Sequence, residues 1–460
     1  MLYFFCCCLL LSACDKEEEW LDVKRQSTDV TPASMKDMEA LLNNTYVFNA
    51  GYAVLGLCGS DNIILTDDNL AAASEQDRRL YLWDPNPYIT DKGVLDYLNQ
   101  YNRVRYANLV LEGLDKLGTA SDPAQGSRFQ AEALFFRAMT YYNLSQTYCV
   151  PYAPDKLSAP GLVLRTGSDP NIVNQRSSIQ DTYDNILQDF RQAAAVLPRN
   201  GKYSSSPSRP AAHAFLAKVF LSMELYDSAW YHADKALAEY STLLDYNDPV
   251  LVNPSSSFRF PAFSSDASLN NPEIIFFASS GSTAITWPFY GIQYAHPALY
   301  ASYGTDDLRR TLIYQDLGAG RVQFWGAYAG TYYNFSGIAS NELFLIRAET
   351  AARAGRTTDA MSDLNTLLRK RYRTGTYTDR AAASAEDALQ QVLTERRKEL
   401  PFTGQLAWED LRRLNKDPRF ARTLTRVQNG ITYELPPGDK RYTFLIPPAE
   451  VAAGVQQNER

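Results

Sequence analysis

Histidine is scarce in this chain, and its scarcity excludes one large class of enzyme. The 460 residues include three histidines, His213, His232 and His296. None of them lies in an HExxH motif or in any other closely spaced pair of ligands. We therefore do not expect a zinc hydrolase, and the sequence predicts no metal and no cofactor.

An excess of basic residues is also missing. Lys and Arg total 45 against 52 Asp and Glu, which leaves a net charge of −7 and a pI of about 5.3. Because a nucleic-acid-binding domain normally carries a basic face, the sequence argues against nucleic acid as a partner. With 45% hydrophobic and 21% charged residues, the chain has the composition of a folded protein with a sizeable core.

Long hydrophobic runs are absent, since a transmembrane helix takes about 20 apolar residues. The apolar stretch near the start, residues 2–13, is too short for such a helix and fits the hydrophobic part of a secretory signal peptide. No Lys or Arg precedes it, which departs from the charged start that signal peptides usually have. We expect the chain to be held at a membrane by lipid alone.

The apolar stretch ends in the tetrapeptide LSAC at residues 11–14, which has the order of a bacterial lipobox. The two small residues suit the narrow groove of the peptidase that cuts before Cys14. We predict a signal peptide at 1–13 and a lipidated acidic tether at 14–34, with Cys14 as the lipidated residue. Residues 15–19, DKEEE, resemble the surface-export tag of some Gram-negative lipoproteins; a solvated linker is the alternative interpretation.

Few cysteines remain once the signal peptide and the lipid are taken into account. The three at 6–8 would leave with the signal peptide, and Cys14 would carry the lipid. Cys58 and Cys149 would then remain in an oxidising compartment. Two alternatives stay open, a disulfide between them or two buried free thiols.

Helical periodicity dominates both ends of the chain and is weak in the middle. Residues 49–90 and 241–337 are expected to be irregular, because they are rich in Gly, Pro, Asp or aromatic residues. A proline-rich linker is expected at 151–175. The expected helices, bounded by capping residues, Pro and Gly, lie at about 35–48, 94–117, 122–148, 178–197, 209–223, 227–240, 341–354, 357–372 and 385–400.

The helix pair at 209–240 has the small-residue spacing of a tetratricopeptide repeat. Ala217, Ala229 and Ala236 fall where two helices of such a repeat cross closely, and a degenerate second copy starts at Ala348. Unrelated helical hairpins are the alternative, because alanine is common in helices. The sequence thus predicts a mainly α fold, a tetratricopeptide-like helical repeat scaffold with a large, irregular, loop-rich insert.

This pattern divides the chain after the tether into three parts. They are an N-terminal helical part at 35–240 with repeat-like hairpins and the 49–90 loop region, an aromatic-rich insert at 241–337 that carries ligand loops, and repeat-like helices with a closing segment at 338–460.

Aromatic residues are concentrated in the insert, where they occupy 13 of the 49 positions from 287 to 335, against 12% in the whole chain. Their flat faces can stack on a sugar ring or hold peptide side chains. We expect three or four to face solvent, and an internal cluster beneath the loops is the alternative. The predicted ligand-binding residues are Trp287, Tyr290, Trp325 and Tyr328 from the insert, with Trp83, Asp67 and Asp68 from the 49–90 loops.

Motifs spread along the chain resemble the SusD/RagB family. The segment EALFFRA at 132–138 resembles a helix of that family, and ERRKELPFTG at 395–404 with DLRR at 410–413 resembles its C-terminal signature. The segment LIPP at 445–448 is similar to the closing part of the family. Each motif alone is weakly specific, but together they run in the family's order over nearly the whole chain.

The resemblance implies a cell-surface, outer-membrane lipoprotein that binds a nutrient, most simply a glycan, and delivers it to a SusC-like TonB-dependent transporter. It also implies that the helical repeats dock against the transporter while the loops hold the nutrient. A peptide-binding member of the family is one alternative, and a repeat scaffold that binds only a protein segment is another. A surface glycoside hydrolase would need two acids about 5–10 Å apart across a cleft.

The charged motif at the end of the helix expected at 385–400 is interpreted as scaffold. Glu395 and Glu399 stand there beside basic residues, and nothing marks a nucleophile or a tuned carboxylate pair. We expect Arg412 and Arg413 to pair with these acids. The sequence therefore predicts no catalytic residue and no enzyme activity.

Replacing Cys14 with Ala removes the residue that would carry the lipid, so the protein should be released from the membrane. Fractionation of cells that express wild type and Cys14→Ala measures this directly. A Cys14→Ala protein that still sediments with the outer membrane would contradict the lipid anchor.

Overall fold

Antiparallel helices form most of the regular secondary structure. The structure is a computed structural model that describes residues 32–89, 93–118, 122–172, 175–261, 270–287, 291–325 and 328–460. The helices are α2 (Met35–Leu42), α3 (Thr45–Phe48), α4 (Leu55–Gly59), α5 (Asp67–Ala72), α6 (Glu75–Tyr81), α7 (Leu95–Leu117), α8 (Pro123–Tyr148), α9 (Ile179–Val196), α10 (Arg209–Ser222), α11 (Tyr226–Glu239), α12 (Pro297–Ala301), α13 (Arg309–Leu312), α14 (Ser340–Arg353), α15 (Thr357–Leu368), α16 (Ala385–Glu399), α17 (Leu406–Leu414) and α18 (Pro448–Ala452).

The strands are short and form four two-stranded antiparallel sheets among the described residues. The pairs are β1 (Ile63–Ile64) with β3 (Tyr294–Ala295), β2 (Ile274–Phe276) with β6 (Ile338–Ala339), β4 (Tyr314–Asp316) with β5 (Val322–Phe324), and β7 (Leu424–Gln428) with β8 (Ile431–Leu435).

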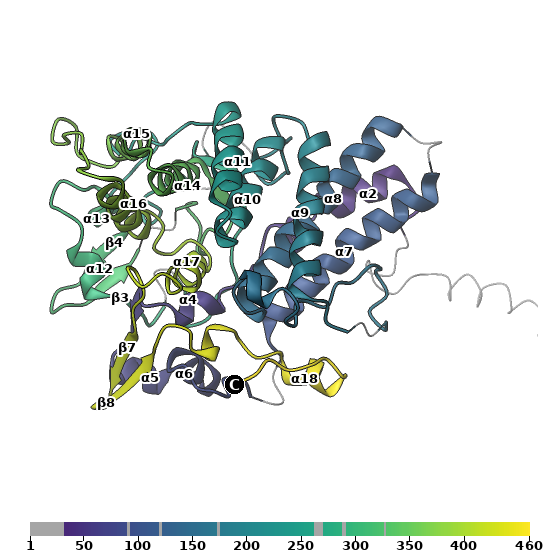
Figure 1. The fold of residues 1–460 in the computed structure, drawn as a ribbon, viewed down its shortest axis with the longest axis horizontal. Helices are drawn as coiled ribbons and strands as arrows, with labels where there is room; N and C mark the ends of the chain where they lie inside the picture. Colours follow the sequence, from purple (N-terminus) through teal and green to yellow (C-terminus); the bar gives the residue numbers. More distant parts are fainter. Residues whose placement is uncertain are drawn as a thin grey trace, which may run out of the picture.

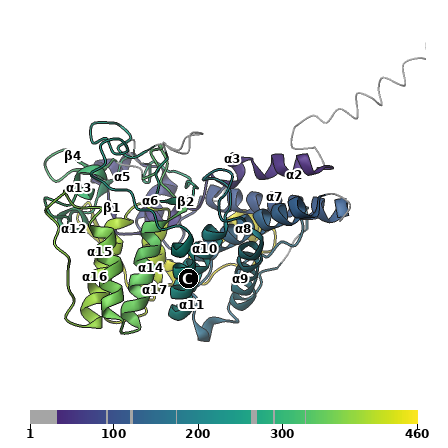
Figure 2. The ribbon, with the colours of Figure 1, turned by 90° about the horizontal axis from the view of Figure 1, so that it is seen from above.

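Consecutive helices pack side by side as hairpins, with α7 on α8, α8 on α9, α10 on α11 and α14 on α15 (Figure 1). Helix α11 also packs on α14, which joins the two predicted repeats into one scaffold. In Figure 2, β4, α5, α6 and β2 gather along one edge of the molecule, while α9 and α11 lie toward the opposite edge. The mainly helical fold predicted from the sequence is confirmed.

The small residues of the predicted repeats lie in the core. Ala217, Ala229 and Ala236 have no exposed surface, and neither does Ala348. A methyl group at such positions lets neighbouring helix backbones approach closely, so the alanine spacing reflects helix packing.

Local capping explains why the long helices begin where the sequence indicates. The Ser178 hydroxyl accepts the backbone N–H of Asp181, and the Asp181 carboxylate accepts the backbone N–H of Ser178, which together form a capping box at the start of α9. At α8, Asp122 caps the free N–H groups of the first turn, and Pro123 takes a position where no N–H is needed.

The expectation that 49–90 would be irregular is wrong in part, because three short helices form there. Helix α4 is capped from a distance: the buried Asp96 carboxylate accepts the backbone N–H groups of Val54 and Leu55 at 2.6 and 2.8 Å. Burial raises the pKa of Asp96 to about 6, against the effect of these two bonds. A helix held by a residue about 40 positions away leaves no local periodic signal.

Further elements that were not predicted include the short helices α12 and α13, which lie in the insert expected to be irregular, helix α17 and the β7–β8 hairpin. The hairpin turns at Asn429 and Gly430, which both have positive φ angles, 49° and 76°. An Asn-Gly pair between two strands is a strong sequence signal for a hairpin, so this turn could have been predicted from the sequence.

The insert is tied to both helical parts by its short sheets. Ile63 pairs with Ala295, which joins the 49–90 region to the insert, and Ile274 pairs with Ala339, which joins the insert to the start of α14. A core cluster beneath the insert includes Tyr303, Tyr314 and Phe324. The alternative of an internal aromatic cluster therefore holds for part of the insert.

The end of α16 anchors a buried ion-pair network. Arg309 contacts Asp307 and Glu395 at 2.7 and 2.6 Å, and Arg371 contacts Glu273 and Glu399 at 2.6 and 2.8 Å. Burial by itself would raise the pKa of Glu395, but the cations around it, Arg309 foremost, lower that pKa to about 2. The scaffold interpretation agrees with this arrangement.

The predicted partners of these acids are wrong, because Arg412 and Arg413 pair elsewhere. Arg413 forms ion pairs with Glu349 and Asp410. Arg412 donates to the backbone carbonyls of Ser145 and Cys149. Both arginines lie on α17, which the sequence analysis did not predict. The directions in which their side chains point could therefore not be predicted.

Cys58 and Cys149 are buried free thiols. They belong to different core clusters, which excludes the disulfide alternative in this structure. Among the described residues, no helix combines the length and the apolar character needed to cross a membrane.

Leu at Ala217 or Ala348 should lower the free energy of unfolding by about 1–3 kcal/mol, because the buried site has no room for the added atoms. Gly at the same sites should cost about 1 kcal/mol, since it is a poorer helix former. Chemical denaturation measures both, and Ala124→Leu at the exposed start of α8 is the matched control, expected to be nearly neutral. If Leu at both buried sites left stability unchanged, these alanines would not lie at close helix contacts.

Candidate functional site

Two segments of the insert meet and present aromatic side chains to solvent. The Asn334 side-chain amide donates to the Thr286 carbonyl at 2.8 Å, and this bond joins the segment before Trp287 to the segment after Tyr333. The Trp287 side chain is 36% exposed, and Tyr332 and Tyr333 are 46% and 44% exposed. Among the described aromatic residues of 287–335, these three are the exposed ones, which agrees with the expected three or four.

A second aromatic group lies beside this one, around Arg259. The Tyr332 ring makes an edge contact with Phe258, with the centroids 4.8 Å apart. The Arg259 guanidinium lies 5.7 Å from the centre of the half-buried Trp325 ring and donates to the carbonyls of Thr311 and Tyr314. We call Trp287, Trp325, Tyr332 and Tyr333 the aromatic loops.

Two of the other predicted site residues take part in internal contacts. The Tyr328 hydroxyl donates to Glu273, and its half-buried ring packs on Phe335 at 5.3 Å. Asp67 accepts the backbone N–H of Asn429 at 2.8 Å, so it holds the turn of the β7–β8 hairpin. Asp68 is exposed in the first turn of α5, and Tyr290 lies outside the described residues.

Trp83 does not face solvent, which corrects its prediction as an exposed ligand-binding ring. It is 5% exposed, and its indole N–H donates to the Gly59 carbonyl at 2.9 Å. The guanidinium of Arg426, on β7, lies 4.2 Å from the Trp83 ring centre and 3.7 Å from that of Tyr81. Cation–π contact and burial hold the ring inside, and Arg426 is a residue that sequence reasoning missed.

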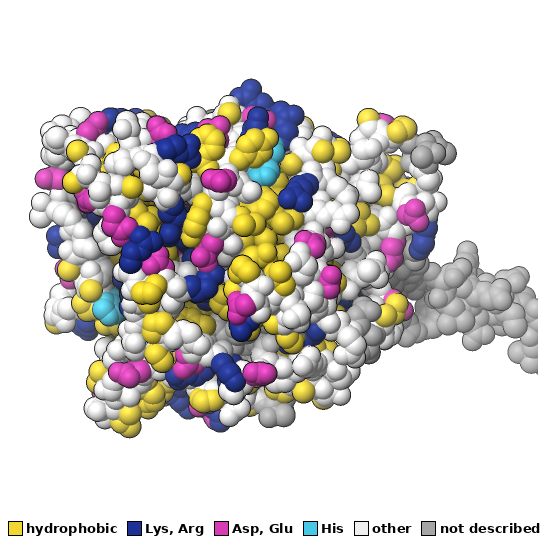
Figure 3. Space-filling model, in the orientation of Figure 1, with side chains coloured by type: hydrophobic (Ala, Val, Ile, Leu, Met, Phe, Trp, Pro, Cys, Tyr) yellow, Lys and Arg dark blue, Asp and Glu magenta, His cyan; other side chains and the backbone are white. Residues whose placement is uncertain are grey.

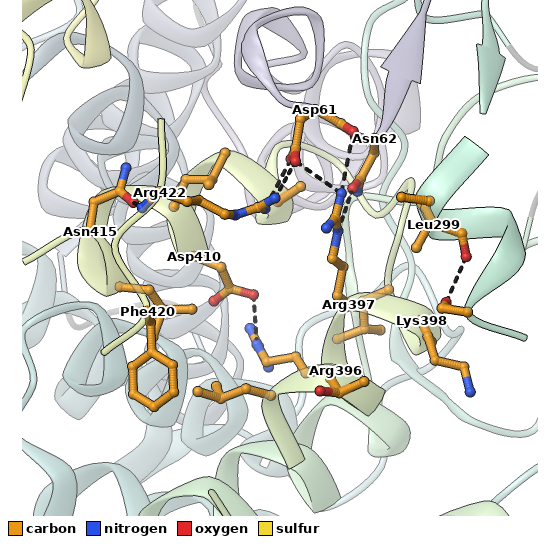
Figure 4. Close-up of a pocket in the computed structure, with 18 of the residues that line it drawn as sticks. Asp61, Asn62, Leu299, Arg396, Arg397, Lys398, Asp410, Asn415, Phe420 and Arg422 are labelled. Atoms are coloured by element: carbon orange, nitrogen blue, oxygen red, sulfur yellow. Dashed lines mark hydrogen bonds and ion pairs between the residues drawn. The ribbon is translucent and has the colours of Figure 1, made fainter. Parts of the chain in front are cut away.

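A pocket of about 480 Å³ opens between α12, α16 and α17 (Figure 4). This volume lies within the range of small-molecule sites. Its lining comes from five segments of the chain: Asp61 and Asn62; Ala298, Leu299 and Ser302; Gln390, Leu393, Thr394, Arg396, Arg397, Lys398 and Leu400; Ala407, Asp410, Leu411, Leu414 and Asn415; and Arg419, Phe420, Ala421 and Arg422.

Asp61 lies between two arginines at one end of this pocket. Figure 4 shows Arg397 and Arg422 reaching toward it from two sides, and each guanidinium has a nitrogen 3.0 Å from an Asp61 oxygen. Burial would raise the pKa of Asp61, but the two arginines lower it below its usual value. Burial lowers the pKa of nearby His296, and the two arginines add to that effect against the opposite influence of Asp61. Sequence analysis did not predict this pocket, because one of its walls is α17, a helix that was not predicted either.

Figure 3 shows the face of the molecule that carries α9–α11, where apolar side chains gather around a histidine. The exposed apolar residues on these helices and their connections include Val196, Leu225 and Tyr231. His213 and His232 lie side by side there, with their Nδ1 atoms 3.0 Å apart. Burial, first of all, lowers the pKa of His232 to about 4.

Comparison with known proteins gives consistent matches along the chain. Residues 19–221 match a family profile described as starch-binding and associating with the outer membrane, and residues 340–444 match one described as the SusD family. SusD-like protein P2 from Formosa agariphila is 24% identical over 340 residues, which cover 62% of this chain and 64% of that protein. The match therefore spans less than two thirds of that relative.

Solved structures share the fold over nearly the whole chain. A putative sugar binding protein from Bacteroides vulgatus matches with a TM-score of 0.71 at 19% identity, covering 94% of this chain and 99% of that one. A SusD superfamily protein from Bacteroides thetaiotaomicron matches with a TM-score of 0.69 at 20% identity, covering 93% of this chain and 100% of that one. At these identities, the similarity shows a common fold.

Trp83→Ala should lower the free energy of unfolding by about 3–5 kcal/mol, because it empties a buried site and removes one aromatic face from Arg426. Urea denaturation measures the loss. Trp287→Ala is the matched control, since its ring is partly exposed and its loss should cost much less. Equal losses for the two variants would show that Trp287 is also a core residue.

Proposed function

Because this chain belongs to the SusD/RagB family, we propose that it is a lipid-anchored protein of the outer-membrane surface that binds a glycan nutrient. The observation that carries the proposal is the exposure of Trp287, Tyr332 and Tyr333 on two segments joined by the Asn334–Thr286 bond. Exposed rings held on a fixed backbone provide flat apolar faces at little entropic cost, and sugar rings stack on such faces. The family description as starch-binding supports a glycan over a peptide.

The proposed role includes delivery of the glycan to a SusC-like TonB-dependent transporter. The aromatic loops would hold the nutrient while the helical face over α9–α11 rests on the transporter. This face carries the exposed apolar residues Val196, Leu225 and Tyr231, which suits a protein contact. Cys14 would supply the lipid anchor at the cell surface.

The rival function of a glycoside hydrolase finds little support in Glu273, which contacts Tyr328 of the insert, or in the predicted site residue Asp67. Glu273 is fully buried, is bound by Arg371 and accepts the Tyr328 hydroxyl, and Asp67 is bound to the hairpin turn. Carboxylates that make such contacts stabilise the fold and are not placed to act on a glycosidic bond. We therefore propose binding without hydrolysis, and the aromatic loops as the place where the glycan lies.

Alanine at Trp287 should weaken glycan binding by about 5- to 150-fold, the loss of one stacking surface worth about 1–3 kcal/mol. Calorimetric titration with maltoheptaose is the first measurement, followed by a glycan array, with melting temperature recorded for each variant. Trp83→Phe is a matched control, because it alters a buried ring and should leave affinity unchanged.

Three outcomes would contradict this proposal. Trp287→Ala with full affinity for a glycan that the wild type binds would place the ligand elsewhere. Binding to a library of unmodified peptides, without binding to any arrayed glycan, would favour the peptide alternative. New reducing ends after incubation with the bound glycan would favour a hydrolase.

A further inference from the structure

The pocket between α12, α16 and α17 has a positive end that its own carboxylates do not neutralise. Asp61 is the carboxylate that pairs with both Arg397 and Arg422 there, which leaves one unmatched positive charge. Arg426 adds a third cation, because its described hydrogen bonds all go to backbone carbonyls. Arg426 does not line the pocket itself, but it interacts electrostatically with Asp61.

The other charged residues of the lining have partners of their own. Arg396 pairs with Asp410 and Glu342, and Lys398 pairs with Asp307 and Glu395. Arg419 pairs with Glu386 and Asp417. The excess of positive charge is therefore local to Arg397 and Arg422, and not a general property of the pocket.

The arginines at this end can be reached by a ligand. The side chains of Arg397 and Arg422 are 32% and 39% exposed, and both line the pocket. Arg396 is almost fully buried, and its Nη1 is a donor without an acceptor among the described residues. In Figure 4 the Arg396 guanidinium lies across the pocket from Asp61, beside Asp410.

Part of the remaining wall is apolar, which favours an organic ligand over a bare inorganic anion. Leu393, Leu411, Leu414 and Phe420 line the pocket from α16, from α17 and from the segment after it. A ligand that uses the whole site needs a negative group for the arginines and a body that can lie on these side chains. Both terminal nitrogens of Arg422 already donate to Asp61, so a ligand would use the remaining N–H groups of the two arginines. A carboxylate is a charged acceptor that suits such donors.

We propose that this pocket binds a small organic carboxylate, with its negative group at Arg397 and Arg422 and its body on the apolar wall. Trp287, Trp325, Tyr332 and Tyr333 do not line the pocket. The site is therefore a second one, separate from the aromatic loops and independent of the glycan proposal.

Two pairs of probes test the carboxylate requirement on the full chain in an uncharged detergent. Glucuronate is compared with glucose, and N-acetyl-phenylalanine with its uncharged amide, by calorimetric titration at low salt. We expect one or both acids to bind while the matching neutral compound does not, and the affinity to fall as salt is raised. The acid that binds more tightly identifies a sugar acid or an amino-acid derivative as the source of the carboxylate.

Variants then place the ligand. Arg422→Gln should weaken binding of the acid by about 10- to 100-fold, the loss of a hydrogen bond to a charged group, while Asp61 keeps Arg397 as its partner. Arg422→Lys keeps the charge and should lose less. Arg369→Gln is the control, since Arg369 is exposed, pairs with Asp379 and lies outside the pocket lining.

Trp287→Ala should leave binding of the acid unchanged, which separates this site from the aromatic loops. The proposal is overturned if the neutral probes bind as well as the acids, if neither acid binds, or if Arg422→Gln binds like the wild type. It is also overturned if Trp287→Ala abolishes binding of the acid. Failure of glycan binding alone would leave the carboxylate result standing.

Discussion

The buried ion-pair network at the end of α16 is the interaction on which the arrangement of the loops depends. Glu395 and Glu399 on this helix face Arg309 and Asp307 from the insert and Arg371 from the segment after α15. Charges out of water are stable only when each has its partner, and removing one partner from such a network costs several kcal/mol. The network therefore fixes the insert to the helical repeats in one position. The exposed aromatic rings therefore belong to an insert that is anchored to the helices.

The helical repeats and the loops of the insert have different structural roles. Alanines without exposed surface, such as Ala217 and Ala348, let the helices of the repeats pack closely and form a stiff base. The insert contains little regular structure of its own. It is held in place by short sheets that it shares with the 49–90 region and with the segment just before α14. A fold of this kind can change its loops while keeping its helices. Solved structures share this fold at 19–20% sequence identity.

The long helices could be predicted from the sequence because their apolar residues recur with helical periodicity over many turns. The exposure of Trp287 could be predicted because this residue lies between Thr286 and Pro288 in an irregular segment without periodic apolar neighbours. Prediction failed for Trp83, whose burial depends on Arg426, a residue 343 positions later in the chain. The carboxylates of α16 were recognised as scaffold, but their partners were misplaced because Arg309 and Arg371 come from other segments. The pocket beside Asp61 was missed for the same reason, since no local pattern brings five segments together.

The contact of Arg426 with Tyr81 and Trp83 also has a consequence for the order of folding. The β7–β8 hairpin joins residues near the C-terminus to loops near the N-terminus, and Asn458 donates to the Tyr148 carbonyl in the same way. Contacts so distant along the chain form late and slow the search for the native state. The N-terminal loops therefore cannot complete their core until the last forty residues have emerged. For the exported lipoprotein proposed above, this delay would keep the chain unfolded until its whole length has crossed the membrane.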